Sequence, residues 1–94
     1  MAQLEKVGEH KTCVFSDSGD TVVVFHNTPV VRFDDKRIIL DTGGWNTPTT
    51  RLRMNQASRE YDLGYRVFQE DFVLCLEWKG KIMPFVTDRV ELER

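Results

Sequence analysis

The hydrophobic and polar positions in the first half of the chain follow the pattern of short strands separated by turns. Four runs rich in β-branched and aromatic residues lie at residues 12–16, 21–26, 30–33 and 37–40. The turn-forming run Asp17-Ser18-Gly19-Asp20 separates the first two, and Asp34-Asp35-Lys36 separates the last two, which favours two hairpins. Pro29 cannot donate to a sheet and marks a turn, bulge or edge. The pattern predicts a meander of three or four strands.

A helical period follows over residues 48–62. Thr47 is a favourable N-cap, and Pro48 falls at the first helical position, where its missing N–H costs nothing. The residues that recur on one face are Thr50, Met54, Ala57 and Tyr61. The opposite face carries Arg59, Asn55, Gln56 and Glu60. One face is therefore predicted to be buried and the other exposed, and Gly64 is expected to close the helix in a left-handed conformation.

The second half returns to the period of strands. Three further runs lie at residues 65–69, 72–78 and 82–86. In the middle run Phe72, Leu74, Leu76 and Trp78 share one face, which is predicted to be core. Val73 and Cys75 are apolar too, which predicts a central strand that is covered at least partly on both sides. Residues 87–94 are predicted to be a last edge strand or a frayed tail.

These elements predict an α+β fold in two layers. Two antiparallel β-meanders flank one central α-helix, in the order βββ-α-βββ, with the apolar face of the helix on a sheet. Residues 1–94 are expected to form a single domain, with frayed ends at 1–11 and 88–94 as one possibility. The pattern leaves open whether the two meanders join in one sheet or fold over each other.

Composition gives a soluble, cytoplasmic protein as the expectation. The 13 basic and 15 acidic residues give a net charge of −2, which provides no overall field for a polyanion. No apolar run is long enough to span a membrane, and residues 1–12 lack the apolar core of a signal peptide. The two cysteines, Cys13 and Cys75, lie in apolar strand patterns and are predicted to be buried and reduced.

One short motif suggests catalysis. The run Ile38 to Leu40 followed by Asp41-Thr42-Gly43 resembles the signature of retropepsin-like aspartic proteases, in which two such aspartates share a proton at a dimer axis. The glycine-rich flap and the later apolar-Gly element of that family do not follow. Asp, Thr and Gly are also favoured where a strand ends in a turn. The strand-exit turn is the preferred interpretation, and the protease is a second alternative.

The helix suggests nucleic-acid binding as the first alternative. Its candidate binding residues are Arg51, Arg53, Asn55 and Arg59, with Trp45 beside the start of the helix. Guanidinium and amide groups contact phosphates and base edges. The arginines do not share one face, however, and the net negative charge opposes a polyanion. Ion pairs within a solvated helix surface explain the same residues.

Metal and cofactor sites are not predicted. His10, Cys13 and His26 could form part of a zinc site, but no second cysteine pair or spaced histidine completes it. No phosphate-binding loop, nucleophile elbow or Cys-His-Asp arrangement occurs in the sequence. We therefore expect no catalytic residue and no cofactor.

Aromatic residues indicate a possible interface. Seven of them lie at positions 45, 61, 65, 68, 72, 78 and 85. They either fill the space between helix and sheet or line an exposed patch where another chain binds. Self-association through such a patch or an edge strand is one way to cover it.

Several residue runs resemble a group of small proteins of tailed bacteriophages, the marine ones especially, to which no activity is assigned. The runs lie at residues 43–45, 49–50, 53–57 and 63–68, within a resemblance that spans residues 22–85. The resemblance implies the infected bacterial cytoplasm as a setting and transfers no catalytic residue. The sequence thus predicts a small phage accessory protein that binds a host or phage protein.

Overall fold

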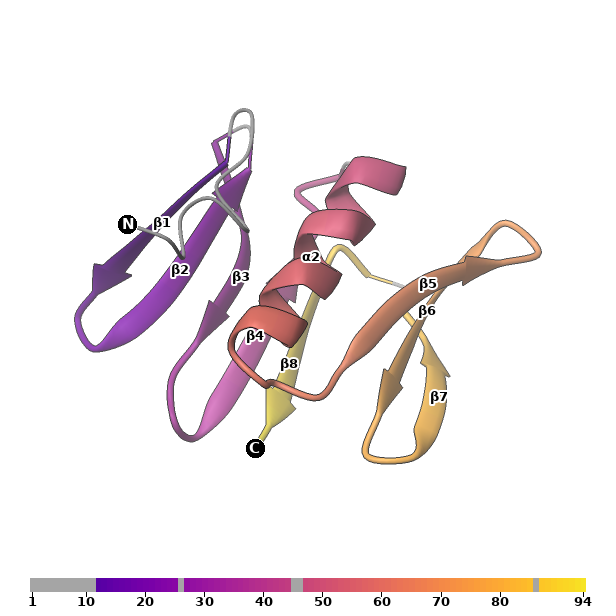
Figure 1. The fold of residues 1–94 in the computed structure, drawn as a ribbon. Helices are drawn as coiled ribbons and strands as arrows, with labels where there is room; N and C mark the ends of the chain where they lie inside the picture. The colour runs from indigo at the N-terminus through magenta and orange to yellow at the C-terminus, as the bar shows by residue number, and fades with distance from the viewer. Residues whose placement is uncertain (1–11, 26, 45–46, 86) are drawn as a thin grey trace.

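The computed structural model describes residues 12–25, 27–44, 47–85 and 87–94. Four strands precede the helix and four follow it (Figure 1). The strands are β1 (Thr12–Asp17), β2 (Asp20–Phe25), β3 (Thr28–Phe33), β4 (Arg37–Asp41), β5 (Arg66–Glu70), β6 (Val73–Trp78), β7 (Lys81–Pro84) and β8 (Arg89–Glu93), and the helix is α2 (Pro48–Glu60). The α+β class is confirmed. The order βββ-α-βββ is wrong, because each half has one strand more.

All strand pairs are antiparallel and fall into two sheets. The larger sheet has the order β1-β2-β3-β4-β8, and the smaller has the order β5-β6-β7. The extra strand of the second half, β8, leaves its own meander and pairs with β4. It does so because Val90 and Leu92 fall opposite Leu40 and Ile38 and extend the apolar face of the larger sheet. Residues 89–93 are therefore an edge strand, one of the two predicted outcomes.

The core lies between α2 and the inner faces of the two sheets (Figure 1). One row of side chains, Val14, Val23, Val31, Leu40 and Val90, crosses all five strands of the larger sheet. A register shift at Val23/Val24 leaves Val30 as the extra residue of a bulge, so that Val30 is buried beside Val31. The predicted helix face covers this surface: Thr50, Met54 and Ala57 are buried and Tyr61 is half-buried.

The helix begins as predicted, but the left-handed residue that closes its C-terminus is not the predicted one. The Thr47 side chain accepts a hydrogen bond from the Thr50 amide at 3.1 Å, and Pro48 is the first helical residue. At the other end the Leu63 amide donates to the Ser58 carbonyl at 2.9 Å, the bond that defines a Schellman motif. The left-handed residue of that motif is Asp62, with φ +56°. Gly64 is also left-handed, with φ +88°, but it lies two residues beyond the position that closes the helix.

Three polar contacts fix α2 against the chain that follows it. Asn55 pairs with the backbone of Val67 in both directions, since its Nδ2 donates to the carbonyl and its Oδ1 accepts from the amide, each at 2.8 Å. The Ser58 hydroxyl donates to the Tyr65 carbonyl at 2.7 Å. The Tyr65 hydroxyl donates to the Met54 carbonyl at 2.6 Å. Asn55 therefore occupies the free edge of β5 as a neighbouring strand would.

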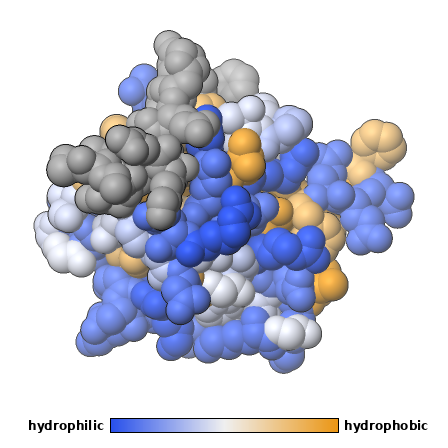
Figure 2. Space-filling model, in the orientation of Figure 1, coloured by the Kyte–Doolittle hydropathy of each residue, from blue (hydrophilic) through white to orange (hydrophobic). Residues whose placement is uncertain are grey.

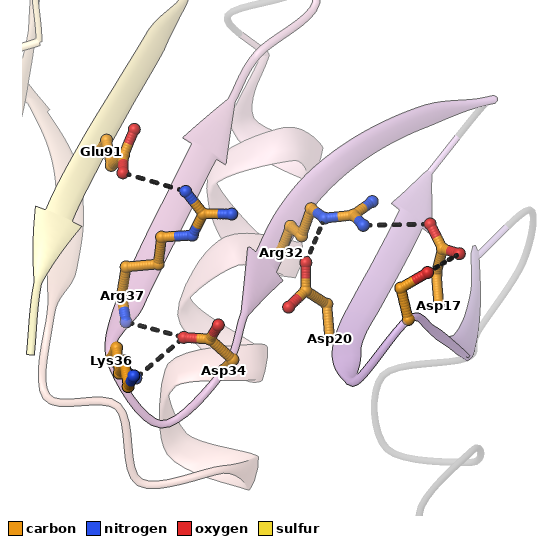
Figure 3. Close-up of polar contacts among 8 residues, drawn as sticks. Asp17, Asp20, Arg32, Asp34, Lys36, Arg37 and Glu91 are labelled. Atoms are coloured by element: carbon orange, nitrogen blue, oxygen red, sulfur yellow. Dashed lines mark hydrogen bonds and ion pairs between the residues drawn. The ribbon is translucent and has the colours of Figure 1, made fainter.

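Charged side chains interact across the face of the larger sheet that points away from α2. Arg32 lies between two carboxylates, with Nε 2.6 Å from Asp20 and Nη2 3.0 Å from Asp17 (Figure 3). Asp34 accepts from the amides of Lys36 and Arg37 in the β3–β4 turn. These two backbone hydrogen bonds hold the pKa of Asp34 below its usual value. Much of the charge on this side of the larger sheet therefore has a partner within the protein.

Two predictions of burial are wrong. Cys13 is exposed, because it lies opposite Val24 on the side of the edge strand β1 that points away from α2. Cys75 is half-buried. Phe72 is 94% exposed, because the β5–β6 turn consists of Asp71 and Phe72 and places Phe72 outside β6.

Candidate interaction surface

The β5–β6–β7 sheet has one buried face and one face open to solvent. Val67, Leu74 and Leu76 are buried on its inner side. Val67 and Leu76 lie opposite each other in the ladder, and Leu76 also lies opposite Met83 on β7. Since side chains alternate along a strand, the residues between them point to the other side of the sheet.

Most residues on this other side are apolar, and we call it the outer face. Its apolar residues are Phe68, Val73, Cys75, Ile82 and Pro84 on the three strands, with Phe72 at the adjoining hairpin tip, and Arg66, Glu70 and Glu77 lie on the same side. Val73 is 46% exposed and Ile82 is 63% exposed. Figure 2 shows hydrophobic side chains at the molecular surface on the side of the molecule where this sheet lies. Within the described residues, no further layer packs on the outer face.

Phe72 has an unusual backbone conformation for its residue type. Asp71 and Phe72 form a two-residue hairpin turn in which both φ angles are positive, 52° and 67°. Two other hairpin turns in the described part of the chain are built in this way, Ser18-Gly19 and Lys79-Gly80, and in both the second residue is glycine. A side chain at that position crowds the backbone, which is why glycine is preferred there. The β5–β6 hairpin has an aromatic residue instead.

Charge is distributed unevenly along the outer face. At the end far from the hairpin tip, Arg66 pairs with Glu77 at 2.9 Å and its guanidinium lies 4.3 Å from the centre of the Phe68 ring. At the tip, Glu70 and Asp71 are exposed on either side of the turn. The row of Phe68, Cys75 and Pro84 therefore lies between a neutralised pair and an acidic end, and Ile82 lies beside the neutralised pair.

The structure does not bring the predicted binding residues together into one site. Trp45 lies outside the described residues. Arg53 is buried, donates to Gln56 at 3.0 Å and lies 5.8 Å from the centre of the Phe25 ring. Asn55 is engaged by Val67. Arg59 is exposed and Arg51 is half-buried. Two of the four helix residues are thus directed into the protein and not toward an external phosphate.

Asp41-Thr42-Gly43-Gly44 forms the strand-exit turn that was preferred over the protease signature. Asp41 accepts from the Gly43 amide at 2.8 Å, and Thr42 accepts from the Gly44 amide at 3.2 Å. Thr42 also donates its hydroxyl to Asp88 at 3.2 Å and its amide to the Asp88 carbonyl at 2.8 Å. The turn thereby ties the end of β4 to the segment that leads into β8.

A cavity of about 460 Å³ lies between the start of α2 and strands β2 and β3. Its lining residues are Phe25, Thr28, Val30, Thr42, Thr47, Thr49 and Thr50. None of them carries a charge, and the hydroxyls of Thr47 and Thr50 bond to each other at 3.0 Å. Among the described residues, no three His, Cys, Asp or Glu side chains are grouped as a metal site requires.

The strand pattern missed the outer face because both faces of β6 are apolar, although the aromatic residues, Phe68 and Phe72 among them, had left an exposed patch as one alternative. The alternation of side chains predicts Phe72 in the core with Leu74 and Leu76. The apolar residues Val73 and Cys75 likewise predict that a second layer covers the other face of β6. The sequence did contain one indication of this face. Val73, Cys75 and Ile82 are apolar, and the chain has too few elements to cover both faces of a second sheet. An uncovered apolar face produces the same pattern as a covered one, so the sequence did not separate the two.

The comparisons with known proteins include a match to a protein family. A family model described as Kyanoviridae Gp96 protein matches residues 1–91. No curated protein and no solved structure matches the chain. The helix α2 is not long and apolar enough to cross a membrane, and the same holds for any other helix in the described part of the chain.

Proposed function

The chain belongs to the Kyanoviridae Gp96 family of phage proteins, and from this premise we propose that it acts by binding another protein through the outer face of the β5–β6–β7 sheet. The observation that supports this most directly is the exposure of Val73 and Ile82 on one side of a small sheet, with Phe72 exposed at its hairpin tip. Three of the five large hydrophobic residues that the described chain exposes belong to this surface. Contiguous apolar patches on soluble proteins mark sites of association.

The geometry of the sheet suits binding more than it suits catalysis. The cavity beside the start of α2 is lined by none of the outer-face residues, and the ion pair on that face, Arg66 with Glu77, is solvent-exposed. A flat apolar surface with a polar border is the usual form of a protein interface. The nucleic-acid alternative loses support, because Arg53 and Asn55 make contacts inside the protein.

A pair of lysine substitutions tests the proposal. Ile82→Lys places a charge on the outer face, where it lies opposite Glu77 in the ladder and leaves the strand pairing intact. Leu52→Lys is the matched control, since Leu52 is 46% exposed on α2 and is not part of this sheet. Tagged wild type and both variants are used to capture proteins from a lysate of phage-infected host cells, with and without nuclease treatment, and the captured proteins are quantified by mass spectrometry.

We expect one stoichiometric protein that wild type and Leu52→Lys retain and that Ile82→Lys loses. The same proteins captured by all three chains would contradict a role for the outer face. Partners that disappear with nuclease treatment would indicate nucleic acid instead.

A further inference from the structure

The tip of the β5–β6 hairpin combines exposure with an unfavourable backbone conformation. Phe72 is 94% exposed and has φ +67°. A left-handed backbone conformation costs free energy for any residue with a Cβ atom. In the isolated protein no burial of the exposed aromatic ring offsets this cost. Figure 1 shows the turn of this hairpin at the end of the molecule, extended beyond α2. The ring is therefore placed where a partner can surround it.

The charges around the ring are of one sign. Glu70 and Asp71 are both exposed, and residues 69–73 contain no basic side chain. The nearest cation on β5, Arg66, is already paired with Glu77. A partner surface that meets this tip therefore needs positive charge beside whatever receives the ring.

The size of the outer face argues against a flat contact between two copies. Strands lie about 4.8 Å apart and rise about 3.3 Å per residue, so three strands of four to six residues present roughly 200 Å² in projection. A stable interface buries about 800 Å² on each partner. A surface this small binds tightly only when one side chain enters a pocket, and an aromatic ring is the commonest such anchor.

We propose that Phe72 is the anchor of this interface and that the partner is a protein with an apolar pocket bordered by lysine or arginine. The proposal rests on the proposed function and adds the chemistry of the partner. The ring enters the pocket, Glu70 and Asp71 pair with its cationic border, and the flanking outer face packs against the surface around it. An anionic membrane is disfavoured as the occupant, because both carboxylates would approach lipid phosphates.

Photo-crosslinking tests which surface is in contact. The chain is made with the photoreactive amino acid benzoylphenylalanine at position 72, and at position 15 as a control. Phe15 is a suitable control because it is 48% exposed on the larger sheet. Each chain is irradiated in lysate of phage-infected host cells, and crosslinked peptides are sequenced. We expect position 72 alone to crosslink to one protein, at an apolar residue with lysine or arginine nearby.

Affinities for that purified partner then test the anchor and its charges. Phe72→Ala is expected to weaken binding at least about 30-fold, whereas Phe15→Ala changes it less than twofold. Phe72→Gly relaxes the left-handed turn, so it should raise thermal stability while binding falls as far as in Phe72→Ala. This opposite response separates an anchor from a structural residue. The double variant Glu70→Gln/Asp71→Asn is expected to bind several-fold more weakly at low salt, with the difference lost at high salt.

The failures of the two proposals are distinguishable. If Ile82→Lys loses the partner and Phe72→Ala binds within threefold of wild type, the outer face is the interface and Phe72 is not its anchor. Crosslinks from position 72 to lipid, to a second copy of this chain or to no molecule overturn the stated partner. If neither Ile82→Lys nor Phe72→Ala changes binding, both proposals are wrong.

Discussion

The contact between Asn55 and Val67 gives the most direct test of how α2 is held on the second sheet. The side-chain amide of Asn55 makes two hydrogen bonds of 2.8 Å with one residue of β5. Asn55→Ala removes both and leaves an N–H and a C=O of β5 without these partners. Each hydrogen bond contributes about 0.5–1.5 kcal/mol, so the gross cost is about 1–3 kcal/mol.

Alanine returns part of this cost because its intrinsic helix propensity exceeds that of asparagine by up to about 0.7 kcal/mol. The net loss in the free energy of unfolding is therefore about 0.3–3 kcal/mol. For a domain of this size, that loss lowers Tm by about 1–24 °C. Urea unfolding followed by tryptophan fluorescence, with Tm from circular dichroism, measures both quantities.

Two further variants control the interpretation. Arg59→Ala changes an exposed residue of the same helix and should leave the free energy of unfolding nearly unchanged. Asn55→Asp retains an oxygen for the Val67 amide but directs another at the Val67 carbonyl, so it should not restore stability. If the free energy of unfolding of Asn55→Ala lies within about 0.3 kcal/mol of that of Arg59→Ala, the pairing with β5 does not hold the helix.

Four other substitutions address single features of the fold. Gly43→Ala should lower Tm by several degrees, because φ is +63° there and an added Cβ would lie 2.6 Å from Thr28 Cγ2; a differential scanning calorimetry trace that matches wild type would contradict this. Asp62→Gly should raise the free energy of unfolding by about 0.5–1 kcal/mol in urea titrations, since Asp62 is the left-handed residue of the Schellman motif. The pKa of Asp34 is lowered in the folded protein, so the ionised carboxylate stabilises the fold above its unfolded pKa of 3.8, and this stabilisation is lost as pH falls through the folded pKa. Asp34→Ala should therefore flatten the acid side of a curve of Tm against pH. An unchanged slope would oppose this. Burial raises the pKa of Tyr65 above its usual 10.0, so the native state loses stability as pH rises above 10.0; ultraviolet titration should show Tyr65 ionising only on unfolding, and Tyr65→Phe should remove that part of the alkaline loss.

Local sequence signals predicted most of the elements, because each is encoded by neighbouring residues. Thr47 and Pro48 determine the helix start, and Ser18-Gly19 makes a tight turn with positive φ at both positions. Such features depend on steric and capping preferences within a few residues. The end of the helix was misplaced because Asp62 is tolerated in the left-handed region that glycine favours, and Gly64 lay close by.

Long-range arrangement and the candidate surface could not be obtained in the same way. The pairing of β8 with β4 depends on packing between residues far apart in sequence, such as Leu92 with Ile38. The exposure of Phe72 depends on whether the turn is Glu70-Asp71 or Asp71-Phe72, a shift of one residue that moves a side chain from one environment to another. Arg53 resembles a phosphate-binding residue by type and is buried beside Phe25. These outcomes depend on tertiary structure that local pattern does not contain.

The placement of β8 also affects how the protein forms during translation. Asp41 of β4 pairs with Arg89 of β8, so β4 has an open edge until the ribosome has added about 50 more residues. At bacterial rates of about 5–20 residues per second, that interval lasts roughly 2–10 seconds. During it, Ile38 and Leu40 lie on a strand whose unpaired backbone can join another nascent chain. Rapid synthesis of this region, or chaperone protection of it, should therefore raise the yield of folded protein when the gene is expressed strongly.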